Sequence, residues 1–266
     1  MNEKYKKLKS IIESYGKAVI FFSGGVDSSL LLYAAKEVLC DNLLAITAIP
    51  EFVPMRERRD ANELCSRLGV SHVTMEVDGL SIEGFKENTP ERCYYCKKAL
   101  FKKMMDIGES RGFNVYMEGS NLDDQGDYRP GLRALEELGI KSPLKEAGLT
   151  KSDIREISRE LSLETWDKPS FACLASRFVY GEEITKEKLR MVELAEDFLV
   201  ELGLKQFRVR IHGEDLARIE VLDEETEMET VLKSRKEIIR RLKEIGFKYI
   251  SMDLEGYRMG SMNEVL

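Results

Sequence analysis

Residues 18–29, Ala18-Val-Ile-Phe-Phe-Ser-Gly-Gly-Val-Asp-Ser-Ser29, decide the fold of this chain. The run Ala18–Phe22 is apolar throughout, as in a buried strand, and residues 28–35 form a good helical run. Ser23-Gly24-Gly25 separates the two. A strand, a glycine turn and a helix start present backbone N–H groups and the positive end of a helix dipole to an anion. The stretch therefore predicts a phosphate-binding loop in an α/β fold with a doubly wound, mostly parallel sheet.

The side chains of this loop suit a pyrophosphate group. Gly24 and Gly25 have no Cβ, so the backbone can approach a phosphate closely. Asp27 would repel a phosphate, and its place is explained by a metal ion that bridges the phosphates. Neither the Gly-Lys-Ser/Thr of a Walker loop nor Gly-x-Gly-x-x-Gly is present.

The loop resembles the PP-loop of the ATP pyrophosphatase family. This resemblance implies ATP binding, transfer of AMP to a substrate oxygen and release of pyrophosphate. The loop residues expected to bind ATP are Ser23, Gly24, Gly25, Val26, Asp27, Ser28 and Ser29.

Composition limits the kind of protein. The chain has 266 residues, enough for one large domain or two modest ones, and 33% of them are charged. The net charge of -7 argues against broad nucleic-acid binding. No apolar run approaches the length of a membrane span and no secretory signal is visible, so we expect a cytoplasmic protein without membrane contact. Five cysteines, an odd number, favour metal ligands, reactive thiols or core residues over a disulfide framework.

Two further strand ends supply candidates for the nucleotide site. The apolar run 43–48 predicts a strand whose end faces adenine, through backbone groups of Thr47 and Ala48. Residues 114–119 predict a fourth strand that leads into an aspartate-rich segment. Carboxylates there can hold Mg²⁺, or can cap a turn or a helix. We therefore add Gly119, Asn121, Asp123 and Asp124 to the ATP site, and assign Mg²⁺ to Asp27 and Asp123.

Cysteines mark two other stretches. Cys93 and Cys96, placed before a helix expected from Lys98, can hold a metal or cluster or form a redox disulfide. Residues 166–177 have no clear period and predict a loop over a site. Within that loop, Cys173 suits either core packing or chemistry.

The composition changes near residue 180. The following segments predict the order helix, two paired strands, helix and strand, which is typical of a small two-layer domain. We expect a PP-loop domain over residues 1–180 and a C-terminal α+β domain over residues 181–266.

Four patches together resemble the LarE family of ATP-dependent sulfur transferases. They are Ser23–Ser29, Cys93–Cys96, Gly119–Gly131 and Trp166–Arg177, followed by a matching tail over residues 208–220. The resemblance implies adenylylation of the carboxylates of pyridinium-3,5-biscarboxylic acid mononucleotide. Sulfur then replaces oxygen to give thiocarboxylates for the nickel-pincer cofactor.

The resemblance also implies roles for residues. The sulfur-bearing cysteine of the family corresponds to Cys173. With Cys93 and Cys96 it would hold a [4Fe–4S] cluster whose fourth iron carries a spare sulfide. Members without the Cys-x-x-Cys pair give up the sulfur of that cysteine instead; here we favour the cluster. We assign catalysis to Cys173, Asp27 and Arg177 and substrate contacts to Arg129, Arg177, Glu196, Arg210, Glu220 and Arg258.

The expected cofactors are ATP, Mg²⁺ and the [4Fe–4S] cluster. The expected partners are a small-molecule carboxylate, sulfide or another sulfur donor, and further copies of the chain in a trimer or hexamer. Three rival functions remain open at this point: a tRNA thiolase of the PP-loop class, an amide-forming PP-loop ligase such as NAD synthetase, and a nucleotide- or metal-binding regulator without catalysis.

Overall fold

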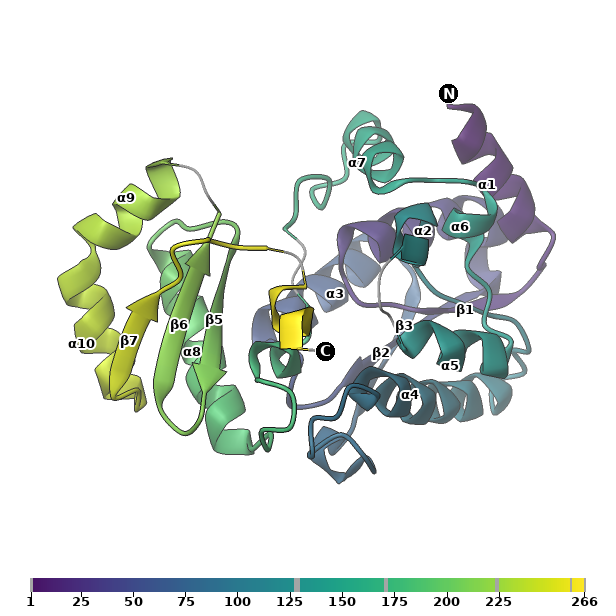
Figure 1. The fold of residues 1–266 in the computed structure, drawn as a ribbon. Coiled ribbons are helices and arrows are strands. Elements are labelled where there is room, and N and C mark those ends of the chain that lie inside the picture. Colours follow the sequence, from purple (N-terminus) through teal and green to yellow (C-terminus); the bar gives the residue numbers. More distant parts are fainter. Residues whose placement is uncertain (1, 127–129, 170–171, 223–224, 259, 266) are drawn as a thin grey trace. The chain divides into compact units, whose positions relative to one another are not determined.

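The computed structural model describes residues 2–126, 130–169, 172–222, 225–258 and 260–265. The chain forms two compact units. Unit 1 comprises residues 1–79 and 93–171, and unit 2 comprises residues 80–92 and 172–266. Figure 1 shows both units. Among the described residues, none of the helices combines the length and the apolar character that a membrane crossing requires.

Unit 1 alternates strands and helices along the chain. Its elements are α1 (Glu3–Glu13), β1 (Ala18–Phe21), α2 (Val26–Leu39), β2 (Leu43–Ile49), α3 (Met55–Leu68), β3 (Ser71–Glu76), α4 (Arg92–Glu109), β4 (Tyr116–Met117), α5 (Gly131–Leu138), α6 (Pro143–Glu146) and α7 (Lys151–Glu160).

The sheet of unit 1 is parallel and has the order β3-β2-β1-β4. The chain moves from β1 outward to β3 and then returns to place β4 on the other side of β1. This reversal is the topological switch point, where ligands bind beyond the carboxyl ends of the strands. The loop after β1 and the segment after β4 both begin there, so the expectation of a doubly wound sheet is confirmed.

Both faces of the sheet are covered by helices. Alternate residues of β1 enter different cores: Ala18 and Ile20 pack with α1, α2, α3, α6 and α7, whereas Val19 and Phe21 pack with α4 and α5. Figure 1 shows α2 and α4 on opposite sides of the sheet. The continuous apolar run of β1 follows from this burial, since neither face of the strand meets water.

Two boundaries differ from the sequence predictions. The helix expected from Lys98 begins at Arg92, so Cys93 and Cys96 lie within α4 instead of before it. The fourth strand contains only Tyr116 and Met117. Its edge is extended by a parallel bridge between Met117 and Lys141.

Unit 2 contains a mixed sheet. Its elements are α8 (Lys186–Glu201), β5 (Phe207–His212), β6 (Leu216–Val221), α9 (Glu225–Lys233), α10 (Arg235–Ile245) and β7 (Tyr249–Met252). β5 and β6 are antiparallel, and β7 joins β6 in parallel. The single helix expected between the paired strands and the last strand is divided at Ser234 into α9 and α10.

The segment 80–92 packs with unit 2 although it lies far from it in sequence. Gly181 N donates to Asn88 O at 3.0 Å, and Ile184 N donates to Lys86 O at 3.0 Å. The second unit therefore includes this segment and residues 172–180, whereas the sequence predicts a single boundary near residue 180.

The helix α7 begins with a capping box formed by Thr150 and Asp153. Asp153 N and Thr150 Oγ1 are 3.2 Å apart, Thr150 N donates to Asp153 Oδ2 at 2.8 Å, and Lys4 Nζ of α1 lies 2.6 Å from the same oxygen. The hydrogen bond from Lys4 and then that from Thr150 lower the pKa of Asp153 to about 2. Because the folded pKa lies below the unfolded value of about 3.9, this carboxylate stabilises the fold above about pH 4 and ceases to do so as the pH falls to about 2.

We expect Asp153→Asn to lower the free energy of unfolding by about 1 kcal/mol at pH 7, since a cap and an ion pair are weakened together. Urea titrations across pH measure the difference. The gap between the variant and the native chain should close as the pH falls from about 4 to about 2. Glu13→Gln, at an exposed position of α1, is the control and should show no gap. A gap of constant size down to pH 2 would contradict the assignment.

Candidate functional site

The phosphate loop ends in a helix start whose amides have no side-chain cap. Gly25 is the N-cap of α2, and no side chain accepts a hydrogen bond there. The first N–H groups of α2 are therefore available to an anion, and the helix dipole favours negative charge at this end. Gly24 has φ of +74° and its Cα faces α3, where an added Cβ would lie 3.4 Å from Ala61 Cβ. Glycine is thus favoured by the backbone conformation, whereas the added Cβ would make only an ordinary contact with Ala61.

The loop serines are not equivalent. Ser23 is exposed, and its Oγ lies 3.0 Å from Ser28 Oγ. Ser28 Oγ also donates to Gly25 O at 3.1 Å. Ser29 is fully buried, and its hydroxyl has no hydrogen-bond partner among the described residues. Ser23 is therefore the hydroxyl at the surface of the loop, whereas Ser28 and Ser29 lie inside it.

The segment after β4 contacts the start of α2 directly. A Cβ added at Gly119 would lie 3.0 Å from Ser28 N and 3.2 Å from Ser28 Cα, so only glycine permits this approach. Asn121 Nδ2 donates to Asp27 Oδ1 at 3.1 Å. The structure thus brings Gly119 and Asn121 to Asp27, as the sequence predicts.

The two aspartates of this segment mainly organise the backbone. Asp124 Oδ2 accepts from Asn121 N at 2.9 Å, and Asp123 N donates to Asn121 Oδ1 at 2.9 Å. Asp123 Oδ2 accepts from Lys151 N at 2.8 Å, which caps the start of α7. The turn-forming role considered for at least one aspartate is therefore present at both.

Lys151 is a site residue that the sequence predictions did not include. Its Nζ forms an ion pair with Asp27 Oδ2, across a separation of 124 positions in the chain. A lysine in the first turn of a helix is placed unfavourably with respect to the helix dipole. This unfavourable position was the signal in the sequence that Lys151 serves another purpose.

Lys168 contacts the phosphate loop from the cysteine-containing stretch 166–177. Its Nζ donates to Gly24 O at 3.1 Å and forms ion pairs with Glu57 at 2.9 Å and Asp60 at 2.7 Å. The ammonium group therefore joins the loop to α3. This residue, too, was not singled out from sequence.

Thr47 serves the sheet through its side chain. Its Oγ1 donates to Phe22 O at 2.9 Å and lies 2.8 Å from His72 Nε2. Burial lowers the pKa of His72, so the imidazole is neutral at pH 7. These contacts fix the end of β1 just before the loop. Adenine contact through the backbone of Thr47 and Ala48 stays a prediction.

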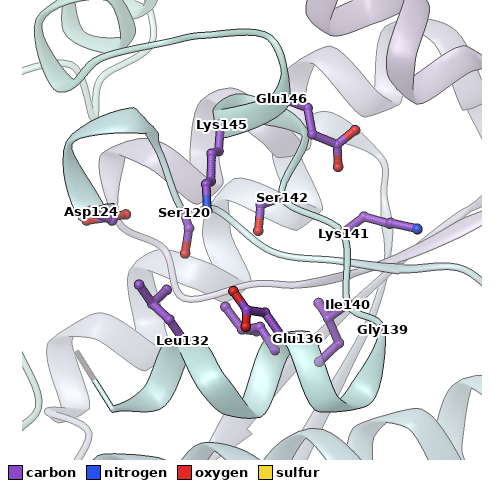
Figure 2. A pocket seen from close by; sticks show the side chains of 11 residues that line it. Ser120, Asp124, Leu132, Glu136, Gly139, Ile140, Lys141, Ser142, Lys145 and Glu146 are labelled. Carbon is purple, nitrogen blue, oxygen red and sulfur yellow. The ribbon is translucent and has the colours of Figure 1, made fainter. Parts of the chain in front are cut away.

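A pocket of about 560 Å³ lies beside the segment after β4 (Figure 2). Ser120 and Asp124 form one side of it, and Lys145 points into it between Ser120 and Ser142. Glu118 lies behind these serines, buried, and accepts from Ser120 Oγ at 2.8 Å and from Ser142 Oγ at 2.7 Å. The hydroxyl protons of both serines are thereby directed away from the pocket, which leaves Lys145 as a donor to it.

The cysteines of the sequence prediction belong to both units. Cys93 is exposed and Cys96 is buried on α4 of unit 1, whereas Cys173 is half-buried in unit 2. No disulfide joins the five cysteines, all of which lie among the described residues. Within residues that the structure describes, no three His, Cys, Asp or Glu side chains come close enough together to hold a metal ion.

Arg177 and Glu196 form a buried ion pair beneath the turn that carries Cys173. Arg177 Nε lies 2.8 Å from Glu196 Oε1, and Nη2 lies 3.0 Å from Oε2, with both side chains almost wholly removed from solvent. Burial raises the pKa of Glu196, but the adjacent Arg177 outweighs it and the pKa is lowered. Arg177 Nη1 donates to Ala172 O at 3.0 Å and to Cys173 O at 3.3 Å. In this structure Arg177 thus holds the turn.

Arg210 and Glu220 form a second buried pair in unit 2, with Nη2 and Oε2 2.7 Å apart. Arg210 Nη1 donates to Ser176 O at 2.9 Å. Arg258, near the C-terminus, instead pairs with Glu255 at 2.9 Å and Glu264 at 3.1 Å. Arg129, also predicted to contact substrate, lies outside the described residues.

Comparisons with known proteins find relatives that match nearly the whole chain. A model of the NAD synthase family matches residues 1–92, which contain the phosphate loop. The chain is 36% identical over 264 residues to the pyridinium-3,5-bisthiocarboxylic acid mononucleotide synthase of Lactiplantibacillus plantarum, covering 99% of this chain and 95% of that one. It is 39% identical over 266 residues to the uncharacterized protein slr1717 of Synechocystis sp., covering 100% and 99%. It is 29% identical over 207 residues to a tRNA-specific 2-thiouridylase of Fusobacterium nucleatum, covering 65% and 59%.

Proposed function

Because the chain belongs to the LarE family of ATP-using sulfurtransferases, which includes the pyridinium-3,5-bisthiocarboxylic acid mononucleotide synthase, we propose that it converts a substrate carboxylate into a thiocarboxylate. The substrate that the family points to is pyridinium-3,5-biscarboxylic acid mononucleotide. The observation that carries the proposal is the uncapped start of α2, with Asp27 beside it, in a chain that also carries Cys93, Cys96 and Cys173.

The first step is activation of the carboxylate. A carboxylate oxygen attacks the α-phosphorus of ATP, the bond to the β-phosphate oxygen breaks, and pyrophosphate leaves. The amides of α2 and the hydroxyl of Ser23 bind the departing phosphates, since their charge is stabilised by oriented donors. The product is an acyl adenylate, in which AMP is a good leaving group.

Asp27 and Lys151 have different roles in this step. In the structure the two side chains neutralise each other. We propose that ATP separates them: the Lys151 ammonium binds a phosphate, and the Asp27 carboxylate binds the Mg²⁺ that the phosphates bring. Asp123, the second predicted magnesium ligand, accepts a hydrogen bond from Lys151 N and is thereby attached to the start of α7. Mg²⁺ supplies charge neutralisation for the departing pyrophosphate.

The second step replaces oxygen by sulfur. A sulfur nucleophile attacks the acyl carbon, the bond to the AMP oxygen breaks, and AMP leaves. We propose that Cys173 carries out or directs this attack. Arg177 and Arg210 donate to backbone carbonyls on either side of it, which restrains the turn that carries the thiol.

The donor set suits a [4Fe–4S] cluster with one open iron. Three thiolates, from Cys93, Cys96 and Cys173, match the number of protein ligands that leaves one iron available. Such a cluster, when bound, supplies a sulfide for transfer. Cys93 and Cys96 are three positions apart on α4, so their side chains are neighbours on the surface of the helix.

Four residues predicted to contact substrate have their charged atoms engaged inside unit 2. They are Arg177, Glu196, Arg210 and Glu220. We propose that they hold the Cys173 turn through these contacts. Substrate contact by Arg129 and Arg258, a sulfide-type donor and a trimeric or hexameric assembly stay predictions.

One experiment tests this function. The full chain is purified without oxygen, its iron is measured, and it is incubated with ATP, Mg²⁺, sulfide and pyridinium-3,5-biscarboxylic acid mononucleotide. We expect a thiocarboxylate product, equal amounts of AMP and pyrophosphate, about four iron atoms per chain, and an unchanged protein mass after turnover.

Other outcomes distinguish the alternatives. A protein without iron whose Cys173 loses one sulfur during turnover would establish the sacrificial route in place of the cluster. A chain that thiolates tRNA, and leaves the mononucleotide unchanged, would overturn the proposal in favour of a tRNA thiolase.

A further inference from the structure

The turn that carries Cys173 is held almost entirely through its carbonyl groups. Three arginines of unit 2 donate to four carbonyls within five consecutive residues. Arg177 Nη1 donates to Ala172 O and Cys173 O, and Arg210 Nη1 donates to Ser176 O. Arg92 Nη1 donates to Ala175 O at 2.8 Å. The turn continues as a short 3₁₀-helix, Leu174–Arg177. A turn of this length has few hydrogen bonds of its own, so its conformation depends on these donors.

Arg92 differs from the other two arginines because it comes from a distant part of the chain. It lies 83 positions before Ala175 and is only 4% exposed. Its guanidinium also donates to the side-chain oxygen of Asn88, and it stacks against the Tyr180 ring at 5.6 Å from the ring centre. A buried guanidinium must have its donors satisfied, so these acceptors define where it can lie.

Asn88 anchors Arg92 in turn. Asn88 is fully buried and has a φ of +53°, a conformation that asparagine tolerates better than most residues. Its Nδ2 donates to Val179 O at 2.6 Å, and its backbone oxygen accepts from Gly181 N at 3.0 Å. The pair Asn88 and Arg92 therefore joins residue 175, within the Cys173 turn, to residues 179–181, which follow that turn.

We propose that Arg92 is a positioning residue for Cys173. It acts by holding Ala175 O, and so sets the direction in which the Cys173 thiol is presented. The proposal rests on the proposed function in one respect, the use of Cys173 in sulfur transfer. Cys93 follows Arg92 directly in the chain. One arginine thus connects the backbone next to Cys93 with the turn of Cys173.

The side chain required is specific. Lysine would keep the charge at position 92, but a single ammonium on a flexible stem does not reproduce a planar guanidinium that meets two acceptors at once. Asn88→Gly offers a complementary change, because glycine accepts a positive φ, and the change removes the carboxamide that orients Arg92 and also donates to Val179 O.

The test measures the reactivity of individual cysteines in the full, reduced, iron-free chain. N-ethylmaleimide is added under limiting conditions, and the alkylation rate at each cysteine is followed by peptide mass spectrometry. In Arg92→Gln we expect the rate at half-buried Cys173 to rise about tenfold, since a hydrogen bond from a charged group is lost. The rate at exposed Cys40, in unit 1, is the internal reference and should stay unchanged. Arg190→Gln, at an exposed arginine of unit 2, is the matched control.

Each outcome decides the proposal. A Cys173 rate equal to that of the native chain in a folded Arg92→Gln protein would overturn it, because a purely structural arginine would lower the melting temperature without changing this rate selectively. If Arg92→Gln does not fold, the alkylation rate of Cys173 is measured in Asn88→Gly, and an unchanged rate in that variant would overturn the proposal. Arg92→Lys should lower kcat for sulfur transfer while ATP–pyrophosphate exchange is retained. A native chain that forms no thiocarboxylate would refute the proposed function, yet the alkylation result would still stand.

Discussion

Replacement of Cys173 by serine is expected to abolish thiocarboxylate formation, with a loss of at least about a thousandfold, while carboxylate activation continues. A hydroxyl keeps the size of the side chain and the backbone bonds of Arg177 to the turn, but it supplies neither a transferable sulfur nor a cluster ligand. In the proposed mechanism the activating step uses residues of unit 1, to which Cys173 does not belong. Release of pyrophosphate should therefore remain within about threefold of the native rate, since a mutation acting on the later step leaves the earlier barrier intact.

Parallel variants make this result informative about mechanism. If a cluster is used, Cys93→Ser and Cys96→Ser should cause the same loss as Cys173→Ser. If Cys173 gives up its own sulfur, those two variants should retain product formation. Cys40→Ser is the control, because Cys40 is exposed and belongs to neither predicted set. Product formation by Cys173→Ser at the native rate would contradict the role of this residue in both routes.

Asp27→Asn is expected to abolish ATP-dependent activation itself. Asparagine can still meet Asn121, but it loses the charge that pairs with Lys151 and that would hold Mg²⁺. Removal of a group that stabilises charge in the transition state costs about a hundredfold or more. ATP–pyrophosphate exchange with the carboxylate substrate measures this step without sulfur.

The control for Asp27 is Asp41→Asn, whose completely exposed side chain lies in the short 3₁₀-helix Cys40–Asn42 after α2. It should keep the native exchange rate. Lys151→Met tests the partner: it should weaken ATP binding, seen as a raised KM for ATP. Native exchange in Asp27→Asn would contradict the magnesium role and would leave the ion pair with Lys151 as a structural feature.

Much of the structure of unit 1 could be predicted from short stretches of sequence. The continuous apolar run at Ala18–Phe22 predicted a strand buried on both faces, and the alternate packing of Ala18 and Val19 into different cores is the physical basis of that pattern. The capping box of Thr150 and Asp153 also depends on near neighbours in the chain, because the two residues are three positions apart.

The boundaries of the helices and strands were harder to predict from the sequence. Cys93 and the two tyrosines after it are not strong helix formers, and the helix was expected to begin at Lys98. In the structure α4 begins at Arg92, whose side chain is buried against Asn88 and Ala175. Packing of a residue at the helix end thus outweighed local propensity.

The sequence by itself determined that a strand, a glycine turn and a helix start at Ala18–Ser29 form a phosphate-binding loop, because those properties depend on neighbours in the chain. Only the tertiary structure decided which side chains meet the loop and the reactive cysteine. Lys151 reaches Asp27 over 124 positions, and Arg92 reaches Ala175 over 83. Such pairs follow from strand order and from the packing of the segment 80–92, since a buried charge lies wherever the completed fold offers it a partner.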